Sequence, residues 1–265
     1  MADRPRRSAS GYDGIANQFE KHRTFPPATV EAIRRAVLAC LPGVERPRLL
    51  DLGAGTGRIG RWFVKAADDY VGLDLSWDML KVFQGSIGCE HAARLVQANG
   101  GALPFPDATF DAVLLAQILR GTRCWRPIAE EACRVRRSPG ALIAGGTVAP
   151  RDGVDTRMRE RLEVIVCALG APWYRLRSGD QASEYFNAAA DAAERVAAAQ
   201  WQSSRTARGF LERHQGGVRF STLPEPIRLE ALRQLSDWAQ RTFGSLDAIS
   251  TETLLFELKI FRFQQ

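Results

Sequence analysis

The stretch that decides the fold is DLGAGTG, residues 51–57, which joins an apolar run to a helical pattern. Three glycines alternate with small residues here, and glycine permits a positive φ or a close approach of the backbone to a ligand. The acid Asp51 stands two residues before the first of these glycines. A glycine turn between a strand and a helix predicts a loop that binds a small molecule, whereas a turn that only connects the two elements is the alternative.

Outward from this loop, residues 48–147 alternate short apolar runs with helical patterns. Strands are expected at residues 48–53, 70–75, 94–98, 110–117 and 141–147, and helices at 57–66, 76–87 and 127–137. Ser76 is the expected N-cap of the second helix. This repetition predicts a parallel sheet with helices on both faces.

The flanking segments are expected to be mainly helical. Helices are expected at residues 29–41, 155–169, 180–196 and 226–243, and strands at 198–203 and 253–263. The chain therefore divides into an N-terminal tail that covers the ligand (1–28), a binding core (29–150) and a C-terminal part (151–265). Residues 150–178 and 205–245 of that last part are too long for simple loops, which predicts helical cap insertions.

The bulk composition limits the class of protein. The chain has 265 residues, of which 45% are hydrophobic and 25% charged, as in ordinary globular domains. No apolar run approaches the ~18–20 residues of a membrane span, and the first residues contain no apolar signal segment. Five widely spaced cysteines without a C-x-x-C pair predict reduced cytoplasmic thiols and no zinc site. The net charge of +6 is a modest excess, which makes a nucleic-acid partner the weaker expectation.

The charge of Asp51 distinguishes two classes of ligand. Residues 55–60 also match the G-x-G-x-x-G pattern of dinucleotide-binding loops. A diphosphate would be repelled by a carboxylate at the end of the strand. S-adenosylmethionine (SAM) instead carries an ammonium and a sulfonium, and one unit charge pair at ~4 Å is worth about 4 kcal/mol at an effective dielectric near 20, before desolvation. Asp51 therefore favours SAM.

Two further polar residues follow neighbouring strands. Asp74 lies 21 residues after Gly53, at the end of the second strand, where a carboxylate can accept hydrogen bonds from both ribose hydroxyls. Asn99 and Gly100 follow the third strand, and the amide can bond an adenine edge. A helix cap at Asp74 and an ordinary Asn-Gly turn at Asn99 are the alternatives.

Four stretches carry a resemblance to a known family. LLDLGAGTGRIGRWF, YVGLDLSWDML, LVQANGGALPFPDATFDAVLLAQIL and IAEEACRVRRSPGALI resemble class I SAM-dependent methyltransferases of the ubiquinone and menaquinone biosynthesis type (methyltransferase type 11). The resemblance covers residues 48–147. It implies an α/β, Rossmann-like sheet that is mostly parallel with an antiparallel last strand, and SAM as the cofactor.

The resemblance also implies roles for individual residues. Those that would cradle the methionine part of SAM are Asp51, Gly53, Ala54, Gly55 and Gly57. Those that would contact the ribose and adenine are Asp74, Leu75, Met79, Asn99 and Gly100. Gln117 would lie near the transferred methyl group, and the residues that would close over the cofactor are Tyr12, Phe19 and Arg23.

The sequence departs from the family pattern in three places. Asn99 stands where the family usually has aspartate, and Ser138-Pro139-Gly140 replaces Pro-Gly-Gly. Gln117 and Arg120 stand where related sequences often carry histidines, so no general base and no other catalytic residue is assigned.

Transfer from a sulfonium can still proceed through alignment, for which models allow ~7–11 kcal/mol. We therefore expect methyl transfer to a small-molecule acceptor. The alternatives are a SAM-binding module without chemistry and a nucleic-acid methyltransferase.

Overall fold

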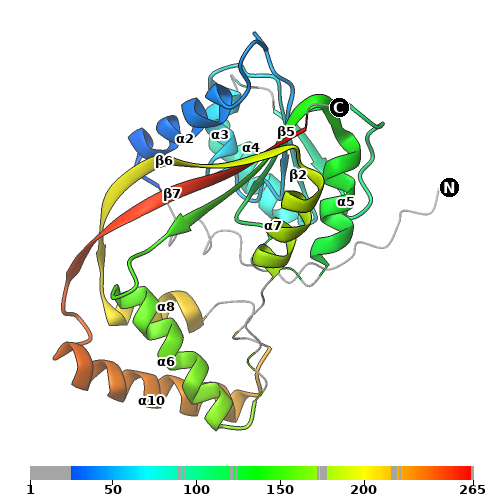
Figure 1. Cartoon of the computed structure of the whole chain (residues 1–265). Helices are drawn as coiled ribbons and strands as arrows, with labels where there is room; N and C mark the ends of the chain where they lie inside the picture. The colour runs from blue at the N-terminus through cyan, green and yellow to red at the C-terminus, as the bar shows by residue number, and fades with distance from the viewer. Residues whose placement is uncertain are drawn as a thin grey trace. The chain divides into compact units, whose positions relative to one another are not determined.

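The computed structural model describes residues 25–88, 91, 93–119, 122, 124–171, 173, 178–215, 220 and 222–263 (Figure 1). The chain forms two compact units, each described separately below. Unit 1 comprises residues 1–146, 176–199 and 256–265, and unit 2 comprises residues 147–175 and 200–255. Among the described residues, no helix combines the length and the apolar composition needed to cross a membrane.

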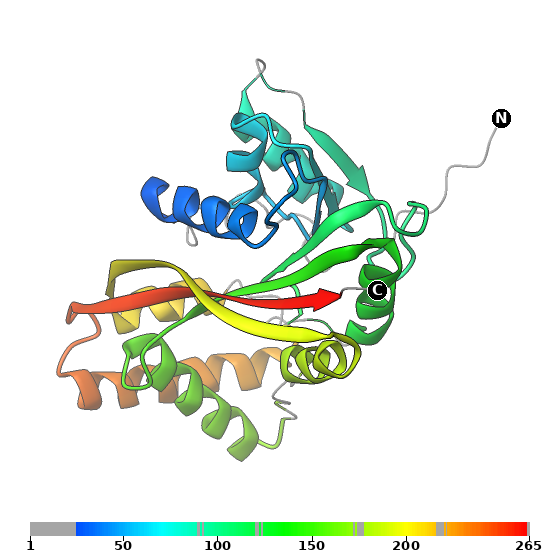
Figure 2. The same ribbon diagram turned by 45° about the horizontal axis from the view of Figure 1, so that its top comes forward.

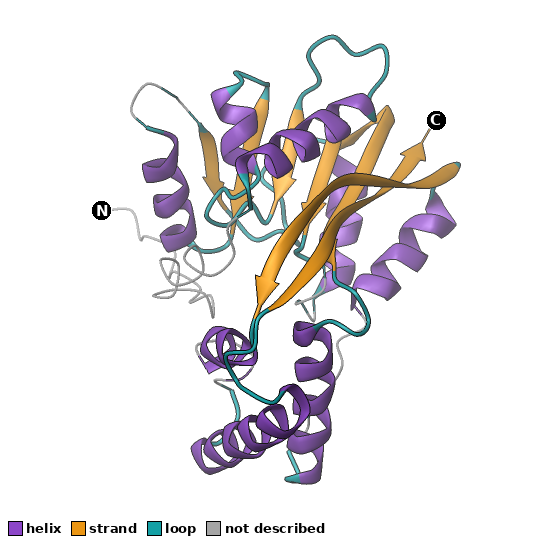
Figure 3. Cartoon of the chain, turned by 90° about the vertical axis from the view of Figure 1, so that its left-hand side faces the viewer, coloured by secondary structure: helices purple, strands orange, loops and turns teal. Residues whose placement is uncertain are grey.

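A seven-stranded sheet has the order β3-β2-β1-β4-β5-β7-β6. Its strands are β1 (Leu49–Leu52), β2 (Tyr70–Asp74), β3 (Arg94–Gln97), β4 (Phe110–Ala116), β5 (Arg136–Val148), β6 (Ala192–Arg205) and β7 (Ser250–Phe263). Neighbouring strands among β1 to β5 pair in parallel, whereas β7, the last strand of the chain, points the opposite way (Figure 3). This mixed sheet confirms the Rossmann-like architecture expected from the sequence.

Helices cover both faces of the sheet in unit 1 (Figure 2). They are α2 (Pro27–Ala39), α3 (Gly60–Lys65), α4 (Trp77–Ile87), α5 (Trp125–Val135) and α7 (Ser178–Ala189). Ser76 caps α4 as expected, because its hydroxyl accepts a hydrogen bond from Met79 N at 3.4 Å.

The apolar residues of successive strands share one core with α5 and α7. Leu50 and Leu52 of β1 pack there with Val113 and Leu115 of β4 and with Phe186 of α7. Side chains alternate between the faces of a sheet. Asp51, between these two leucines, therefore faces the side that carries α3 and α4.

Unit 2 contains a separate apolar core between α6 (Val154–Ala168), α8 (Ala207–Gln215) and α10 (Glu225–Phe243). Met158, Phe210 and Leu235 are fully buried members of it. Glu252 on β7 stabilises the start of α6, because its Oε1 accepts a hydrogen bond from Val154 N at 2.6 Å. This satisfies one of the N–H groups that a helix leaves without an internal partner.

The structure corrects two expected elements. The helix expected at 180–196 ends at Ala189, and β6 begins at Ala192. Alanines favour a helix locally, but this segment pairs at the sheet edge, where Asp191 N donates to Arg262 O at 2.9 Å.

The second correction concerns the helix expected at 127–137. It ends at Val135, and β5 begins at Arg136, before the strand expected at 141–147. Residues 138–140 form an irregularity inside β5, because Arg136 pairs with Phe110 and the next registered pair is Ala141 with Ala112.

Candidate functional site

The glycine loop folds back over the end of β2. Gly53 N and Ala54 N both donate to Leu73 O, at 2.8 and 2.9 Å, and Gly57 N donates to Ala54 O at 3.0 Å. Gly55 N donates to Asp74 Oδ2 at 2.9 Å. Four N–H groups of the loop are thus used within the protein. A diphosphate site would need such groups for the ligand, so this geometry disfavours a dinucleotide.

The three glycines of the loop differ in their surroundings, although all have positive φ. A Cβ at Gly57 would lie 2.2 Å from Phe83 Cδ2, and one at Gly53 would lie 2.7 Å from Ile118 Cδ1. A Cβ at Gly55 would meet nothing closer than Gly53 O at 4.0 Å. Gly53 and Gly57 therefore permit close packing, whereas the described residues leave space beside Gly55 that a ligand can approach.

Asp51 is a buried carboxylate at the base of this loop, with 2% of its surface exposed. Its Oδ2 accepts a hydrogen bond from Tyr70 Oη at 2.7 Å, while its Oδ1 has no hydrogen-bond partner among the described residues. Burial raises the pKa of Asp51 to about 7, with the Tyr70 bond lowering it and the charge of Asp74 raising it further. A buried carboxylate with one unsatisfied oxygen is costly unless a cation or a donor completes it.

Asp74 ends β2 and binds two backbone groups. Its Oδ2 accepts from Gly55 N, and its Oδ1 accepts from Ser76 N at 2.8 Å. A carboxylate offers about four lone-pair sites, so these bonds are compatible with further donors such as hydroxyl groups. The next residue, Leu75, is 39% exposed, whereas Met79 is 3% exposed and packs inside unit 1. Leu75 is thus accessible at the surface, whereas Met79 lies behind it.

The Asn99 segment follows β3 and forms a tight turn. Asn99 Oδ1 accepts from Gly101 N at 2.9 Å, so the amide stabilises its own loop. Arg134 of α5 holds the residues that follow, because its guanidinium donates to Leu103 O at 3.1 Å and to Phe105 O at 2.8 Å. Asn99 itself is exposed, and Gly100 is half-buried.

Gln117 follows β4 in a backbone conformation that is rare outside glycine, with φ of 62°. Its N donates to Gly145 O at 2.8 Å, and its Oε1 accepts from an Arg58 guanidinium nitrogen at 2.6 Å. The Arg58 guanidinium lies 5.0 Å from the centre of the Phe25 ring. Arg58 and Gln117 therefore join the loop after β1 to the loop after β4.

The structure thus connects the predicted residues of three strands. Asp51 lies at the base of the loop after β1, and Asp74 binds Gly55 within this loop. Gln117 is joined to the same loop by its hydrogen bond with Arg58. The predicted residues Tyr12, Phe19 and Arg23 lie outside the described residues, as do Arg120 and His22.

Sequence reasoning missed Tyr70 and Arg58. In the structure Asp51 pairs with Gly72 in register, and Tyr70 lies two residues before that glycine on the same face. This register is a property of the folded sheet, so the sequence alone carried no signal for Tyr70.

The described histidines lie elsewhere. His91 Nδ1 lies 3.1 Å from Ile87 O at the end of α4, and His214 Nδ1 lies 2.9 Å from Phe210 O within α8. Burial lowers the pKa of His214 to about 4, so this residue is neutral at pH 7. The part of the chain that the structure describes contains no cluster of metal-ligating side chains.

Comparison with known proteins gives one matching family model, described as a methyltransferase domain, over residues 50–144. The demethylmenaquinone methyltransferase of Streptomyces griseus is 32% identical over 146 residues, which are 54% of this chain and 61% of that protein. The demethylmenaquinone methyltransferase of Thermobifida fusca is 26% identical, over 68% of this chain and 76% of that protein. The chain matches about 60% of the length of the Streptomyces protein and of a similar uncharacterised protein from Methanocaldococcus jannaschii.

Solved structures share the fold. The YcgJ protein of Bacillus subtilis superposes with a TM-score of 0.55 at 19% identity, over 88% of this chain and 98% of that one. A putative methyltransferase from Bacillus halodurans superposes with a TM-score of 0.57 at 17% identity, over 89% of this chain and 98% of that one. At these identities the similarity concerns the architecture.

Proposed function

We propose that this protein transfers a methyl group from SAM to a small molecule, and the match of residues 50–144 to a methyltransferase domain supports the proposal. The single observation that carries the proposal is the glycine loop between two carboxylates. Within the described part of the chain, one buried oxygen of Asp51 is unsatisfied and the space beside Gly55 is open. These features suit a cationic methionine moiety and not a diphosphate.

Each residue of the site has a role in holding SAM. Asp51 faces the ammonium of the methionine part, and Gly55 lets that part approach the backbone. Asp74 accepts from the ribose hydroxyls, while Leu75 packs against the adenine ring. The Asn99-Gly100 turn borders the edge of that ring.

The reaction places few demands on acid–base groups. SAM supplies a methyl group bound to a sulfonium sulfur. When the methyl group is transferred, a neutral thioether remains, and this is a good leaving group. The chain's contribution is to hold donor and acceptor in line, and alignment of this kind is worth ~7–11 kcal/mol in intramolecular models. Gln117, which the resemblance implies near the transferred methyl group, is bound by Arg58 at 2.6 Å, and in this proposal the pair helps to orient the acceptor.

Two features suggest classes of acceptor for the reaction. The names of the relatives make a demethylmenaquinone the first compound to test. The arginine-rich segments at 150–178 and 205–245 point to a different class, an acceptor with a carboxylate or phosphate, which is the second to test. That these segments enclose the acceptor stays a prediction from the sequence.

A calorimetric titration followed by a turnover screen tests the function. SAM and its demethylated product, S-adenosylhomocysteine, are expected to bind, and NAD is expected to give no heat. Incubation with SAM and pools of metabolites is then expected to yield one compound heavier by a methyl group. NAD binding without SAM binding would contradict the proposal. SAM binding with no acceptor in any pool would favour a binding module, and a methyl gain on nucleic acid alone would favour that alternative class.

Asn99→Ala is expected to weaken SAM only a few-fold. Its amide already accepts from Gly101 N, so an adenine contact adds one neutral hydrogen bond, which is worth about 1 kcal/mol. The dissociation constant from the same calorimetric titration measures this effect. A loss of more than about 30-fold, roughly 2 kcal/mol, would mean that the turn contributes much more to the adenine site than this geometry indicates.

A further inference from the structure

We infer that Tyr70 is a positioning residue for the methyl donor, because its buried hydroxyl fixes the Asp51 carboxyl group and favours its charged form for the ammonium of the ligand. The inference rests on the proposed function and extends it to a residue with no ligand contact of its own. It predicts that the affinity for the ligand depends on pH through the Asp51–Tyr70 pair.

The geometry of the pair is constrained from all sides. Tyr70 is 3% exposed, and its ring stacks on Phe63 at 5.6 Å and meets Phe83 edge-on at 6.2 Å. The hydroxyl reaches Asp51 through the space left by Gly60, where a Cβ would lie 2.0 Å from Tyr70 Oη. The phenol is thus fixed by packing and donates its hydrogen bond in one direction.

The charges around Asp51 oppose its ionisation when no cation is bound. The titratable groups that face it are Tyr70 and Asp74 of β2. Its neighbour in register on β4 is Leu114, and the helices packed on Tyr70 present Phe63 and Phe83, so none of these adds charge. Burial and the Asp74 charge raise the pKa of Asp51 to about 7, and the Tyr70 bond is the effect that lowers it.

The direction of the pH effect follows from this balance. Below pH 7, Asp51 of the free protein is largely protonated and offers no charge to an ammonium. Binding the ammonium favours the carboxylate, so binding releases a proton and strengthens as the pH rises towards 7. Without its ligand, the folded protein gains stability from protonated Asp51 at low pH, and this contribution is lost as the pH rises through about 7.

The test is a calorimetric titration of the full chain with S-adenosylhomocysteine between pH 5.5 and pH 7.5. This product keeps the ammonium, whose own proton is lost only near pH 8, as for other α-amino groups. The wild-type affinity is expected to rise about tenfold between pH 5.5 and pH 7. In Asp51→Asn the profile is expected to be flat, because the side chain has no charge to lose, and this variant also gives the background from the ligand itself.

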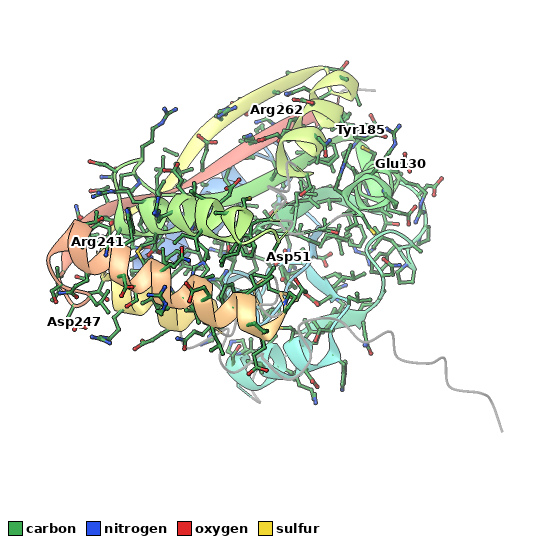
Figure 4. All side chains as sticks on the ribbon, turned by 90° about the horizontal axis from the view of Figure 1, so that it is seen from below. Asp51, Glu130, Tyr185, Arg241, Asp247 and Arg262 are labelled. Atoms are coloured by element: carbon green, nitrogen blue, oxygen red, sulfur yellow. The ribbon has the colours of Figure 1, made fainter. Side chains whose placement is uncertain are left out.

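Tyr70→Phe provides the decisive comparison. It keeps the packed ring and removes only the hydroxyl, so the pKa of Asp51 is expected to rise by about one pH unit, as for one lost bond to a charged group. Within the measured range, the affinity of this variant is expected to keep rising through pH 7.5, where the wild-type profile has begun to level off. Tyr185→Phe is the matched control, because Tyr185 lies on α7 near Glu130 and away from Asp51 (Figure 4). Its profile is expected to superpose on the wild type.

The outcomes separate the two proposals. A flat wild-type profile, or a Tyr70→Phe profile that superposes on the wild type, would overturn the role of Tyr70 and leave the methyltransferase function standing. No binding at any pH would overturn the function and this inference with it. Circular dichroism of each variant at each pH establishes that the fold is retained.

Discussion

Replacing Asp74 with alanine is expected to weaken SAM binding on the order of 100-fold. Hydrogen bonds that involve a charged group contribute about 1.5–3 kcal/mol, and about 2.7 kcal/mol corresponds to a 100-fold change in affinity. The substitution removes the proposed ribose contacts. It also releases Gly55 N and Ser76 N, which Asp74 now holds at 2.9 and 2.8 Å. Calorimetric titration with SAM measures the loss.

Two variants show whether this loss is specific. Asp78→Ala removes another acid of the same segment, which pairs with Lys81 at 2.6 Å on α4, and it is expected to leave the affinity nearly unchanged. Asp74→Asn keeps the shape and an acceptor oxygen, and its affinity is expected to fall between that of the wild type and that of Asp74→Ala. If Asn99→Ala cost as much as Asp74→Ala, the ribose would have been assigned to the wrong residue.

The variants Gly57→Ala and Gly55→Ala are expected to affect different properties of the protein. The first should mainly reduce stability, and the second should mainly reduce the affinity for SAM. Gly57→Ala should lower the free energy of unfolding by about 3 kcal/mol, from a left-handed backbone and from overpacking. Its new Cβ would lie 2.2 Å from Phe83 Cδ2, at a φ of 75°. Gly55→Ala places a methyl group in open space, so only the backbone cost of about 1 kcal/mol applies to stability. That methyl group fills the space next to the loop, so SAM affinity is expected to fall at least tenfold.

Urea unfolding and calorimetric titration of both variants distinguish packing from binding. The expected result is a large stability loss with Gly57→Ala and a large affinity loss with Gly55→Ala. Equal stability losses in the two would mean that the space beside Gly55 is filled by protein, and the placement of the ligand would then be wrong.

The features that could be predicted from the sequence are those that depend on residues close to one another in the chain. The glycine loop, the carboxylates at strand ends and the Ser76 cap each depend on residues within a few positions of one another, and the capping bond is present in the structure. The alternation of strands and helices between residues 48 and 117 depends on apolar runs of the right period, and it was also confirmed.

The features that could not be predicted depend on partners far apart in the chain. The bond from Tyr70 to Asp51 spans 19 positions, and the bond from Arg58 to Gln117 spans 59. The alanine-rich segment after Ala189 has a local preference for helix, but its place beside β7 decides that it is a strand. Such pairings follow from the order of the strands in the sheet. A local pattern of residues does not indicate that order.

The path of the chain between the two units has a consequence for engineering. Three of the four boundaries fall inside strands, after residue 146 in β5, residue 199 in β6 and residue 255 in β7. The core of unit 2 joins α6 from one segment to α8 and α10 from the other. A chimera that takes only residues 147–175 from a relative would pack the α6 of that relative against the α8 and α10 of this chain, which did not evolve together. Both segments must therefore be exchanged together, as one graft with matched strand ends, if unit 2 of a relative is to be transplanted into this scaffold.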